Sequence, residues 1–341
     1  MKIKIIYFTF IYIIIIIISN MNVFSQSDIE QSNVLKTQLI QPEYLKSGDT
    51  ISILAPSGVL NNFDNKITKA INIFKSWGLN VVLGNHIYDK NGHFAGTDKN
   101  REKDFQKALD NKNIKAIWCA RGGYGAVRII DKLNFDNYLK NPKWIIGFSD
   151  ITVIHNKLNF LNSESIHAMM ITGFEDIGQN NDSLSKLKNV LFGDSLSYSI
   201  ASNKNNKTGK SEGIIVGGNL TLIQSTIGSK TELKMKDKIL FIEEIGEYAY
   251  HIDRMLYSLK RAGYFEKCKG LIVGQISDVK KNTTDFGRSI NELILDVLDE
   301  YNFPILFDFP AGHEKTNFPI ILGRKVILDV SKSESEVIFY N

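Results

Sequence analysis

The chain has only 2 cysteines in 341 residues, Cys119 and Cys268. So few cysteines exclude a disulfide-rich secreted scaffold, and both residues lie in or beside apolar runs. We therefore expect two small buried side chains rather than a disulfide. The sequence also has no His-Glu-x-x-His motif and no cysteine–histidine cluster at zinc spacing, so it predicts no metal site.

Sequences that bind phosphate groups are missing as well. The chain has no P-loop, and its glycine-rich segment 121–128 has Arg128 where a dinucleotide-binding fingerprint requires a third glycine. We therefore expect no cofactor. The segment "GFSD" around Ser149 also departs from the G-x-S-x-G turn of α/β-hydrolases, because Ile151 replaces its last glycine.

Acidic residues are absent before Asp28, and the segment 1–25 has the pattern of a signal peptide. A basic start is followed by an almost wholly apolar run over 5–18 and by a polar stretch with small residues at the cleavage positions. A bilayer span needs about 20 apolar residues, so we expect cleavage near Gln26 and no stable membrane span afterwards. The mature protein is then exported, to a periplasm or out of the cell. An uncleaved anchor is the alternative.

The rest of the chain is close to electrically neutral. Removing Lys2 and Lys4 from the 41 basic residues leaves 39, against 37 acidic residues. No basic stripe is interleaved with aromatic residues, so a nucleic-acid partner is not expected. With 43% hydrophobic and 23% charged residues, the composition is that of an ordinary globular protein.

Short apolar segments alternate with helical patterns, which predicts an α/β fold with a parallel sheet covered on both faces. In the first half the expected strands are 49–58, 80–84, 114–120 and 144–148. In the second half they are 213–216, 238–242, 269–274, 305–309 and 325–330. The polar, turn-rich passage between the halves indicates two domains. We expect a linker over 26–42, an N-terminal α/β domain over 43–172, an inter-domain region over 173–212 and a C-terminal domain over 213–341.

Ser149 follows one of the predicted strands and permits two interpretations. Serine is a preferred helix N-cap residue, and a helical pattern follows it. A serine on a sharp turn between strand and helix is also suited to act as a nucleophile. Ser57, the segment 121–125 and Ser149 all follow predicted strands, and ligands of parallel sheets bind at that edge. Their shared position favours the nucleophile.

A serine nucleophile needs a base, and the base needs a group to orient it. Of the 6 histidines, His313 stands apart, because a Pro-Ala-Gly turn after a predicted strand presents it on a loop. Glu243 ends another predicted strand, and Glu244 must face the opposite side of that strand. From these residues alone, the prediction stops at an exported two-domain α/β protein with features of a serine hydrolase.

Six segments together resemble the LD-carboxypeptidase family, the serine peptidases of family S66. In chain order they are "GDTISILAPSG", "ARGGYGAVRIIDKLNF", "IIGFSDIT", "GGNLTLI", "LFIEEIGEYAYHIDRML" and "GH" followed by "NFPIILG". The resemblance covers about 41–341. It implies a flavodoxin-like parallel-sheet N-terminal domain, a mixed α/β, swivelling β/β/α-like C-terminal domain, and a Ser–Glu–His triad where the two meet.

Carried over residue by residue, the resemblance makes Ser149 the nucleophile, His313 the base and Glu243 the acid that orients it. The backbone N–H groups of Gly123 and Asp150 form the oxyanion hole. The implied reaction is hydrolysis of the amide bond to the terminal D-amino acid, D-Ala, of peptidoglycan-derived tetrapeptides. The muropeptide substrate is then the binding partner, and the resemblance also implies a homodimer.

Two other functions stay open at this point. One is an immunity-type relative that hydrolyses a peptide-nucleotide antibiotic with the same triad. The other is an inactive muropeptide-binding protein. The sequence also departs from the family at one place, where His167 is followed by Ala-Met-Met and family members often have Gly-Pro-Met. That change concerns the shape of the substrate pocket rather than the triad.

Overall fold

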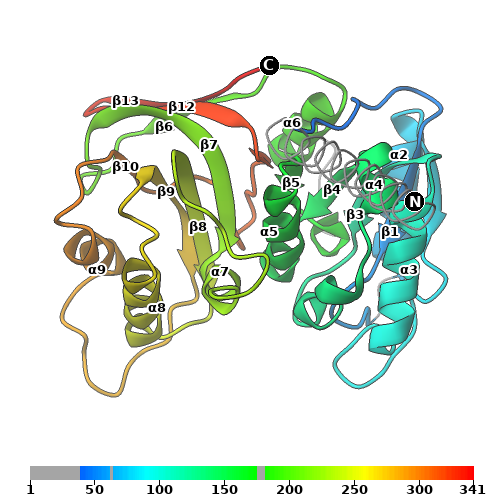
Figure 1. Ribbon diagram of the computed structural model, residues 1–341, viewed down its shortest axis with the longest axis horizontal. Coiled ribbons are helices and arrows are strands. Elements are labelled where there is room, and N and C mark those ends of the chain that lie inside the picture. The colour runs from blue at the N-terminus through cyan, green and yellow to red at the C-terminus, as the bar shows by residue number, and fades with distance from the viewer. Residues whose placement is uncertain (1–38, 62–63, 175–180) are drawn as a thin grey trace, which may run out of the picture. The chain divides into compact units, whose positions relative to one another are not determined.

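Two β-sheets organise the residues that the computed structural model describes, which are 39–61, 64–174 and 181–341 (Figure 1). Residues Gln41–Asn341 form one compact unit that contains both sheets. The segment 1–25, predicted to be a signal peptide, lies outside the described residues, as does most of the predicted linker over 26–42. None of the helices in the described part is long and apolar enough to cross a membrane.

The first sheet has six strands in the order β11-β5-β4-β3-β1-β2. Its strands are β1 (Thr50–Leu54), β2 (Asn80–Leu83), β3 (Ile114–Cys119), β4 (Trp144–Gly147), β5 (Ser165–His167) and β11 (Ile320–Leu322). The first five run parallel to one another in the order 2-1-3-4-5 of flavodoxin-like folds, and β11 is antiparallel to β5. The predicted α/β fold class is therefore confirmed.

Helices connect these parallel strands and cover the sheet. They are α2 (Asp64–Ser76), α3 (Asp98–Asp110), α4 (Asp136–Lys140) and α5 (Thr152–Phe160). On α2, the buried side chains Ile67, Ala70 and Phe74 recur at helical spacing and pack on the sheet. All residues of β4 are buried, as expected of a strand that is covered on both faces.

The second sheet has seven strands in the order β10-β9-β8-β7-β12-β13-β6. They are β6 (Ser197–Ala201), β7 (Gly209–Asn219), β8 (Lys238–Ile245), β9 (Cys268–Ser277), β10 (Ile305–Leu306), β12 (Lys325–Val330) and β13 (Glu334–Phe339). Strands β7 to β10 are parallel, and β12, β13 and β6 complete the sheet in antiparallel pairing. The helices α7 (Leu220–Ser225), α8 (Ala249–Arg261) and α9 (Ile290–Val297) pack against the parallel part (Figure 1).

The passage over 173–212, which the composition marks as a region between domains, holds regular structure. It contains helix α6 (Asp182–Leu191), strand β6 and the start of β7. Helix α6 contributes Leu187, Val190 and Leu191 to the same apolar core as the first sheet. The described residues of this passage from 181 onward therefore belong to the folded unit.

One strand from the second half of the chain belongs to the first sheet. Although β11 lies late in the chain, among the strands of the second sheet, it pairs with β5 at the edge of the first. A buried ion pair follows directly, because Arg324 binds Glu164 with Nε–Oε1 and Nη2–Oε2 distances of 2.9 and 2.6 Å. The first sheet is thus completed by residues about 150 positions further along the chain.

Both cysteines are buried and unpaired. Cys119 ends β3 beneath the carboxyl edge of the first sheet, and Cys268 begins β9. Burial raises the pKa of both thiols, which keeps them in the unreactive, neutral form. The expectation of two small core residues is confirmed.

Candidate active site

Ser149 occupies a strained turn between β4 and α5. Its φ is +60°, a left-handed conformation that an L-residue adopts at a cost of roughly 1–2 kcal/mol. The short 3₁₀ helix Ser149–Ile151 starts at this residue, and the serine side chain makes no capping hydrogen bond to it. The geometry is therefore that of a serine held at a sharp turn. It is not that of an N-cap residue.

His313 and Glu243 are in direct contact. The His313 Nδ1 lies 2.7 Å from the Glu243 Oε2, with the imidazole on a loop after β10 and the carboxylate near the end of β8. The Glu243 side chain is fully buried and that of His313 is 15% exposed. Burial raises the pKa of Glu243, while the bond to His313 acts in the opposite direction. A buried carboxylate so placed stabilises a positive charge on the imidazole.

His313 also lies beside the turn that holds Ser149. The ring centroids of His313 and Phe148 are 4.7 Å apart, and Phe148 immediately precedes Ser149. In the described part of the chain, neither the Ser149 Oγ nor the His313 Nε2 has a hydrogen-bond partner. His313 and Glu243 are thus hydrogen-bonded to each other, and Ser149 lies next to His313 in the chain segment that contacts its ring. Hydrogen bonds between catalytic groups are often long before substrate binds.

Glu244 faces the other way, as the alternation of a strand requires. Its carboxylate accepts hydrogen bonds from the Asn219 side chain and from the backbone and hydroxyl of Thr221. These contacts hold the start of α7, where a negative charge also interacts favourably with the helix dipole. Of the two adjacent glutamates, only Glu243 reaches the histidine.

The predicted oxyanion donors belong to two segments that meet at Ser149. A Cβ atom added at Gly122 would lie 3.2 Å from the Ser149 Cβ and 3.4 Å from the Asp150 N, so a larger residue would require the Ser149 turn to shift. Gly123 follows with a φ of +97°, and its N–H has no backbone acceptor among the described residues. The N–H of Asp150 lies in the first turn of a helix, where donors lack partners within the helix.

The side chain of Asp150 ties these two segments together. Its Oδ2 accepts a hydrogen bond of 2.8 Å from the backbone N–H of Ala126, which follows the glycine-rich segment. The carboxylate is fully buried, and burial raises its pKa. Its structural role was not apparent from the sequence, in which only its backbone was singled out.

Arg101 holds the glycine-rich segment 121–125 through a hydrogen bond to its backbone. Its buried guanidinium donates from Nη1 to the carbonyls of Pro56 and Gly125, at 2.5 and 2.9 Å, and also binds Asp98. It therefore connects the turns that follow β1 and β3. Sequence reasoning missed this residue, because it lies in a helix of mostly polar residues and has no local signal.

The loop that carries His313 is fixed by two amide side chains. The Oδ1 of Asn317 accepts from the backbone N–H of Gly312 at 3.2 Å. Gln275, at the end of β9, accepts from the N–H of Glu314 and donates to the carbonyl of Thr316, both at 2.8 Å. Gln275 thus bridges two backbone groups of the loop after His313, and Asn317 binds the backbone directly before it. Neither amide was identified from the sequence.

A cavity of about 670 Å³ opens beside His313. Phe148, Met169, Met170, Asn181 and Lys315 are among the residues that line it. The Met-Met pair is the departure from the family pattern noted in the sequence, so that change does fall on the wall of this cavity. Its size is in the range of small-molecule sites. Among the described residues, no group of three or more His, Cys, Asp or Glu side chains could hold a metal ion.

Comparison with known proteins assigns the chain to a family. Residues 51–168 match the LD-carboxypeptidase N-terminal domain, and residues 212–328 match the LD-carboxypeptidase C-terminal domain. A Bacillus subtilis protein named "probable murein peptide carboxypeptidase" is 29% identical over 303 residues, which is 87% of this chain and 94% of that protein.

Solved structures agree with this assignment. The muramoyltetrapeptide carboxypeptidase from Oxalobacter formigenes superposes with a TM-score of 0.78 at 27% identity, covering 86% of this chain and 99% of that one. The microcin C7 self-immunity protein MccF has the same fold, with a TM-score of 0.78 at 22% identity, over 88% of this chain and 98% of that one. With both domains matched and the fold shared, the chain belongs to the LD-carboxypeptidase family, the peptidases of the S66 type.

Proposed function

We propose that this chain is a serine-type LD-carboxypeptidase. Its reaction is hydrolysis of the amide between an L-centre and the terminal D-amino acid, D-Ala, of peptidoglycan-derived tetrapeptides, in cell-wall turnover or recycling. Relatives named murein peptide, murein tetrapeptide and muramoyltetrapeptide carboxypeptidase support this substrate class. The observation that carries the proposal is the contact between His313 and Glu243 beside the strained turn of Ser149.

In the first half of the reaction, the Ser149 Oγ attacks the carbonyl carbon of the scissile amide. The His313 Nε2 accepts the hydroxyl proton, and Glu243 stabilises the imidazolium that forms. The N–H groups of Gly123 and Asp150 bind the oxyanion of the tetrahedral intermediate. The C–N bond then breaks, and His313 gives its proton to the leaving amine of D-alanine.

In the second half, a water molecule attacks the acyl-enzyme ester and gives a proton to His313. Collapse of the second intermediate returns that proton to the Ser149 oxygen and releases the shortened peptide as a carboxylate. No step in this sequence uses a metal ion or a cofactor. Activity is therefore expected to survive EDTA.

The decisive experiment is mass spectrometry of a defined muropeptide tetrapeptide after incubation with residues 26–341. The expected product has lost one alanine, and the Ser149→Ala variant produces none. Matched substrates that end in L-Ala, or in an amidated D-Ala, should resist cleavage, because the site must recognise a D-residue with a free carboxylate. Equal rates on the L-Ala substrate would overturn the assignment.

The two alternatives predict different results in the same assay. MccF shares the fold at 22% identity, which is too low to carry its activity to this chain. An immunity-type enzyme would cleave a peptide-nucleotide conjugate and leave the tetrapeptide intact. That substrate is cytoplasmic, which the leader-like segment 1–25 argues against. An inactive binding protein would cleave neither and would not react with an active-site serine reagent.

We also propose that the mature protein is exported to the periplasm and acts as a homodimer. Export is supported by the pattern of the segment 1–25, and the homodimer by the family resemblance. Mature protein from an exporting host should begin near Gln26, and light scattering should give twice the chain mass. An intact Met1 on membrane-bound material would reject cleavage of the leader, and activity in the culture medium would place the protein outside the cell.

A further inference from the structure

A row of polar side chains on helix α5 makes contact with the second half of the chain. Thr152, Asn156 and Asn159 recur every three or four residues and so share one face of the helix. The Asn156 Nδ2 donates to the Thr226 Oγ1 at 3.1 Å, and the Lys238 Nζ donates to the Asn159 Oδ1 at 3.3 Å. These bonds tie the helix that follows the proposed nucleophile to the elements of the second sheet and its helices.

Thr152 begins this row, directly after the 3₁₀ helix Ser149–Ile151. Its Oγ1 accepts a hydrogen bond of 3.0 Å from the backbone N–H of Asn219, and both residues are buried. Asn219 ends β7 and lies directly opposite Glu243 of β8 in the parallel register. One hydrogen bond therefore connects the turn of Ser149 to the strand beside the proposed acid.

The donor of this hydrogen bond is itself held in place. The Asn219 Oδ1 accepts from the backbone N–H of Leu222 at 3.2 Å, and the Asn219 Nδ2 donates to the Glu244 Oε1 at 3.0 Å. The amide thus binds both the start of α7 and the residue next to Glu243. Because its side chain and its strand register are both fixed, Asn219 has little freedom to follow Thr152 if that residue moves.

Strand β7 approaches Thr152 at a second position. Gly218 has a φ of +137°, and a Cβ atom added there would lie 2.5 Å from the Thr152 Oγ1 and 3.0 Å from its Cγ2. The backbone of β7 is therefore packed directly on the threonine side chain. Threonine is β-branched and has a restricted χ1 angle, which fixes the direction of its hydroxyl oxygen.

The contact between Phe148 and His313 is of a different kind. Their ring centroids lie 4.7 Å apart, and dispersion between two rings does not fix one position of the rings relative to each other. A hydrogen bond does so, because it has a narrow range of distances and weakens steeply as its angle closes. The bond of Thr152 to Asn219 is therefore better suited to set the spacing between Ser149 and the proposed acid.

We propose that Thr152 is a positioning residue for the reaction at Ser149. Its hydroxyl oxygen fixes the turn of Ser149 to the strand next to Glu243, and so sets the distance across which the serine passes its proton to His313. The inference rests on the proposed function, in which these three residues form the triad. Thr152 is fully buried, so it acts on the alignment of the triad and not on substrate binding.

Loss of the hydroxyl leaves the backbone N–H of Asn219 buried without this acceptor, which is unfavourable. We expect helix α5 and strand β7 to shift in response, and the distance between Ser149 and His313 to change with them. A displacement of about 1 Å in a catalytic group can lower the rate about 10²-fold. The effect should therefore appear in kcat, while KM stays close to its wild-type value.

The variants Thr152→Ser and Thr152→Ala together isolate the hydroxyl, because both lack the methyl group and only serine keeps the acceptor. Thr152→Ala should lower kcat for the tetrapeptide roughly 10–100-fold and change KM less than about twofold. Thr152→Ser should keep kcat within about threefold of the wild type. Thr152→Val, which keeps the volume and lacks the acceptor, should lose as much kcat as the alanine variant and replaces it if that variant does not fold.

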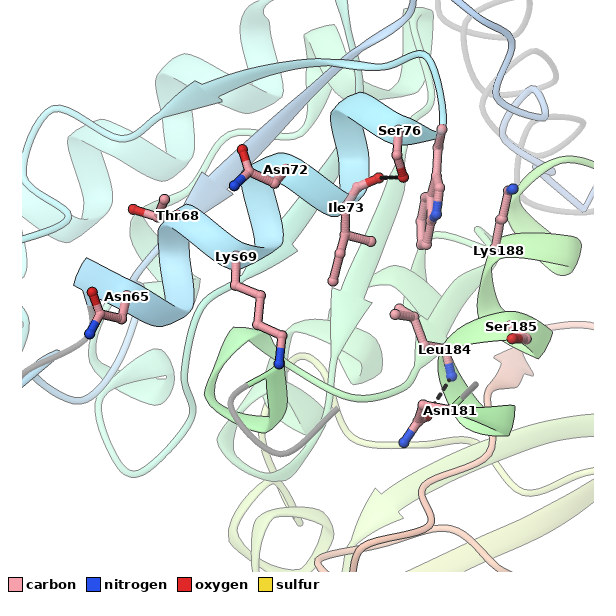
Figure 2. A pocket seen from close by; sticks show the side chains of 11 residues that line it. Asn65, Thr68, Lys69, Asn72, Ile73, Ser76, Asn181, Leu184, Ser185 and Lys188 are labelled. Atoms are coloured by element: carbon pink, nitrogen blue, oxygen red, sulfur yellow. Dashed lines mark hydrogen bonds between the residues drawn. The ribbon is translucent and has the colours of Figure 1, made fainter. Parts of the chain in front are cut away.

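Two alanine controls separate alignment of the triad from a general loss of packing. Thr226→Ala removes the buried hydroxyl that binds Asn156, about one turn of α5 beyond Thr152. It should lower the midpoint of urea unfolding as Thr152→Ala does, but leave kcat unchanged. Thr68→Ala should change neither, because Thr68 is exposed on α2, where it lines a cavity of about 700 Å³ between α2 and α6 (Figure 2). Wild-type kcat in Thr152→Ala, or an equal loss of kcat in Thr226→Ala, would overturn the inference.

Reaction with a fluorophosphonate tests the alignment without the proposed substrate. The Ser149 Oγ forms the bond to phosphorus, fluoride leaves, and His313 accepts the hydroxyl proton. Mass spectrometry should show that Thr152→Ala is modified about tenfold more slowly than the wild type, and Thr226→Ala at the wild-type rate. Equal rates in the wild type and Thr152→Ala would mean that Thr152 does not align the serine. A preserved difference in labelling, in a chain that cleaves no tetrapeptide, would refute only the carboxypeptidase reaction.

Discussion

The imidazole of His313 and the carboxylate of Glu243 meet at 2.7 Å although they are separated by 70 residues of chain. Glu243 lies near the end of β8 in the second sheet, and His313 lies on the loop that leads from β10 to β11. Ser149 comes from the first sheet. A working triad therefore depends on elements of both sheets holding their positions at once.

The proposed triad predicts large and similar losses of activity. Ser149→Ala and His313→Ala should each lower kcat by roughly 10³-fold or more with the fold preserved, because triad members act as a unit. Glu243→Gln should also lower kcat strongly, since an amide cannot stabilise the imidazolium. Steady-state rates on a tetrapeptide and circular dichroism check this. Near-normal turnover of His313→Ala would show that another group is the base.

Asn317 should act as a positioning residue for His313. In Asn317→Ala the N–H of Gly312 loses its acceptor, so the loop loosens and kcat falls roughly 10–100-fold, as small displacements of catalytic groups do. Asn317→Asp keeps an acceptor and adds a negative charge near His313. The charge favours the imidazolium, so the acid limb of the pH–rate profile should move to higher pH. An unchanged profile in Asn317→Asp would leave the residue with a purely structural role.

The buried ion pair of Arg324 and Glu164 should be important for stability. Glu164→Gln leaves the buried guanidinium without its counter-charge, at an expected cost of about 3–5 kcal/mol. Replacing both residues with apolar side chains of similar size should cost much less, because no charge then stays buried. Urea unfolding of the single and double variants measures the loss of unfolding free energy in each. A loss below about 1 kcal/mol in Glu164→Gln would contradict the assignment of a buried pair.

Two buried histidines near the turn of Ser149, His155 and His167, should make the fold sensitive to acid. Burial lowers the pKa of His155 to about 4, and its ring bonds Ser165 and the carbonyl of Gly147. The pKa of His167 is also well below its ordinary value, again because of burial. The unfolded chain takes up these protons first, so stability is full above about pH 6.5 and falls as the pH decreases toward 4.

The expected size of this effect is measurable. From pH 8 to pH 5, His155 alone should reduce the free energy of unfolding by about 2 kcal/mol. A His155→Gln variant should be less stable at pH 8 and should lose less on acidification, which urea unfolding at the two pH values can determine. The same pH dependence in the wild type and the variant would mean that His155 takes up its proton at the same pH in the folded and the unfolded chain.

Local patterns predicted much of the fold. The apolar segments that became β1, β3 and β4 were identified because their side chains are buried on both faces, and the loop position of His313 followed from a Pro-Ala-Gly turn. The alternating pattern of β6, Ser-Tyr-Ser-Ile-Ala, was a usable signal for a strand in the region between the domains. Its surroundings of polar, turn-forming residues hid it.

Other features depend on contacts that no local pattern contains. The positive φ of Ser149 arises where β4 meets the helix that follows, and serine carries no signal for it. Arg101 and Asn317 hold backbone carbonyl and amide groups of distant loops, so their partners appear only after the chain has folded. The pairing of β11 with the first sheet is of the same kind, because a three-residue strand takes its place from its neighbours.

The pairing of β11 with β5 determines when the first sheet can be completed during synthesis. The ribosome makes β1 to β5 first, yet the edge of β5 stays open until Ile320–Leu322 have emerged, close to the end of translation. Glu164 likewise has no Arg324 to pair with until the end of the chain has been made. The nascent chain must therefore spend most of its synthesis with an unfinished first sheet, whose open β5 edge is accessible to chaperones and to the strand edges of other molecules.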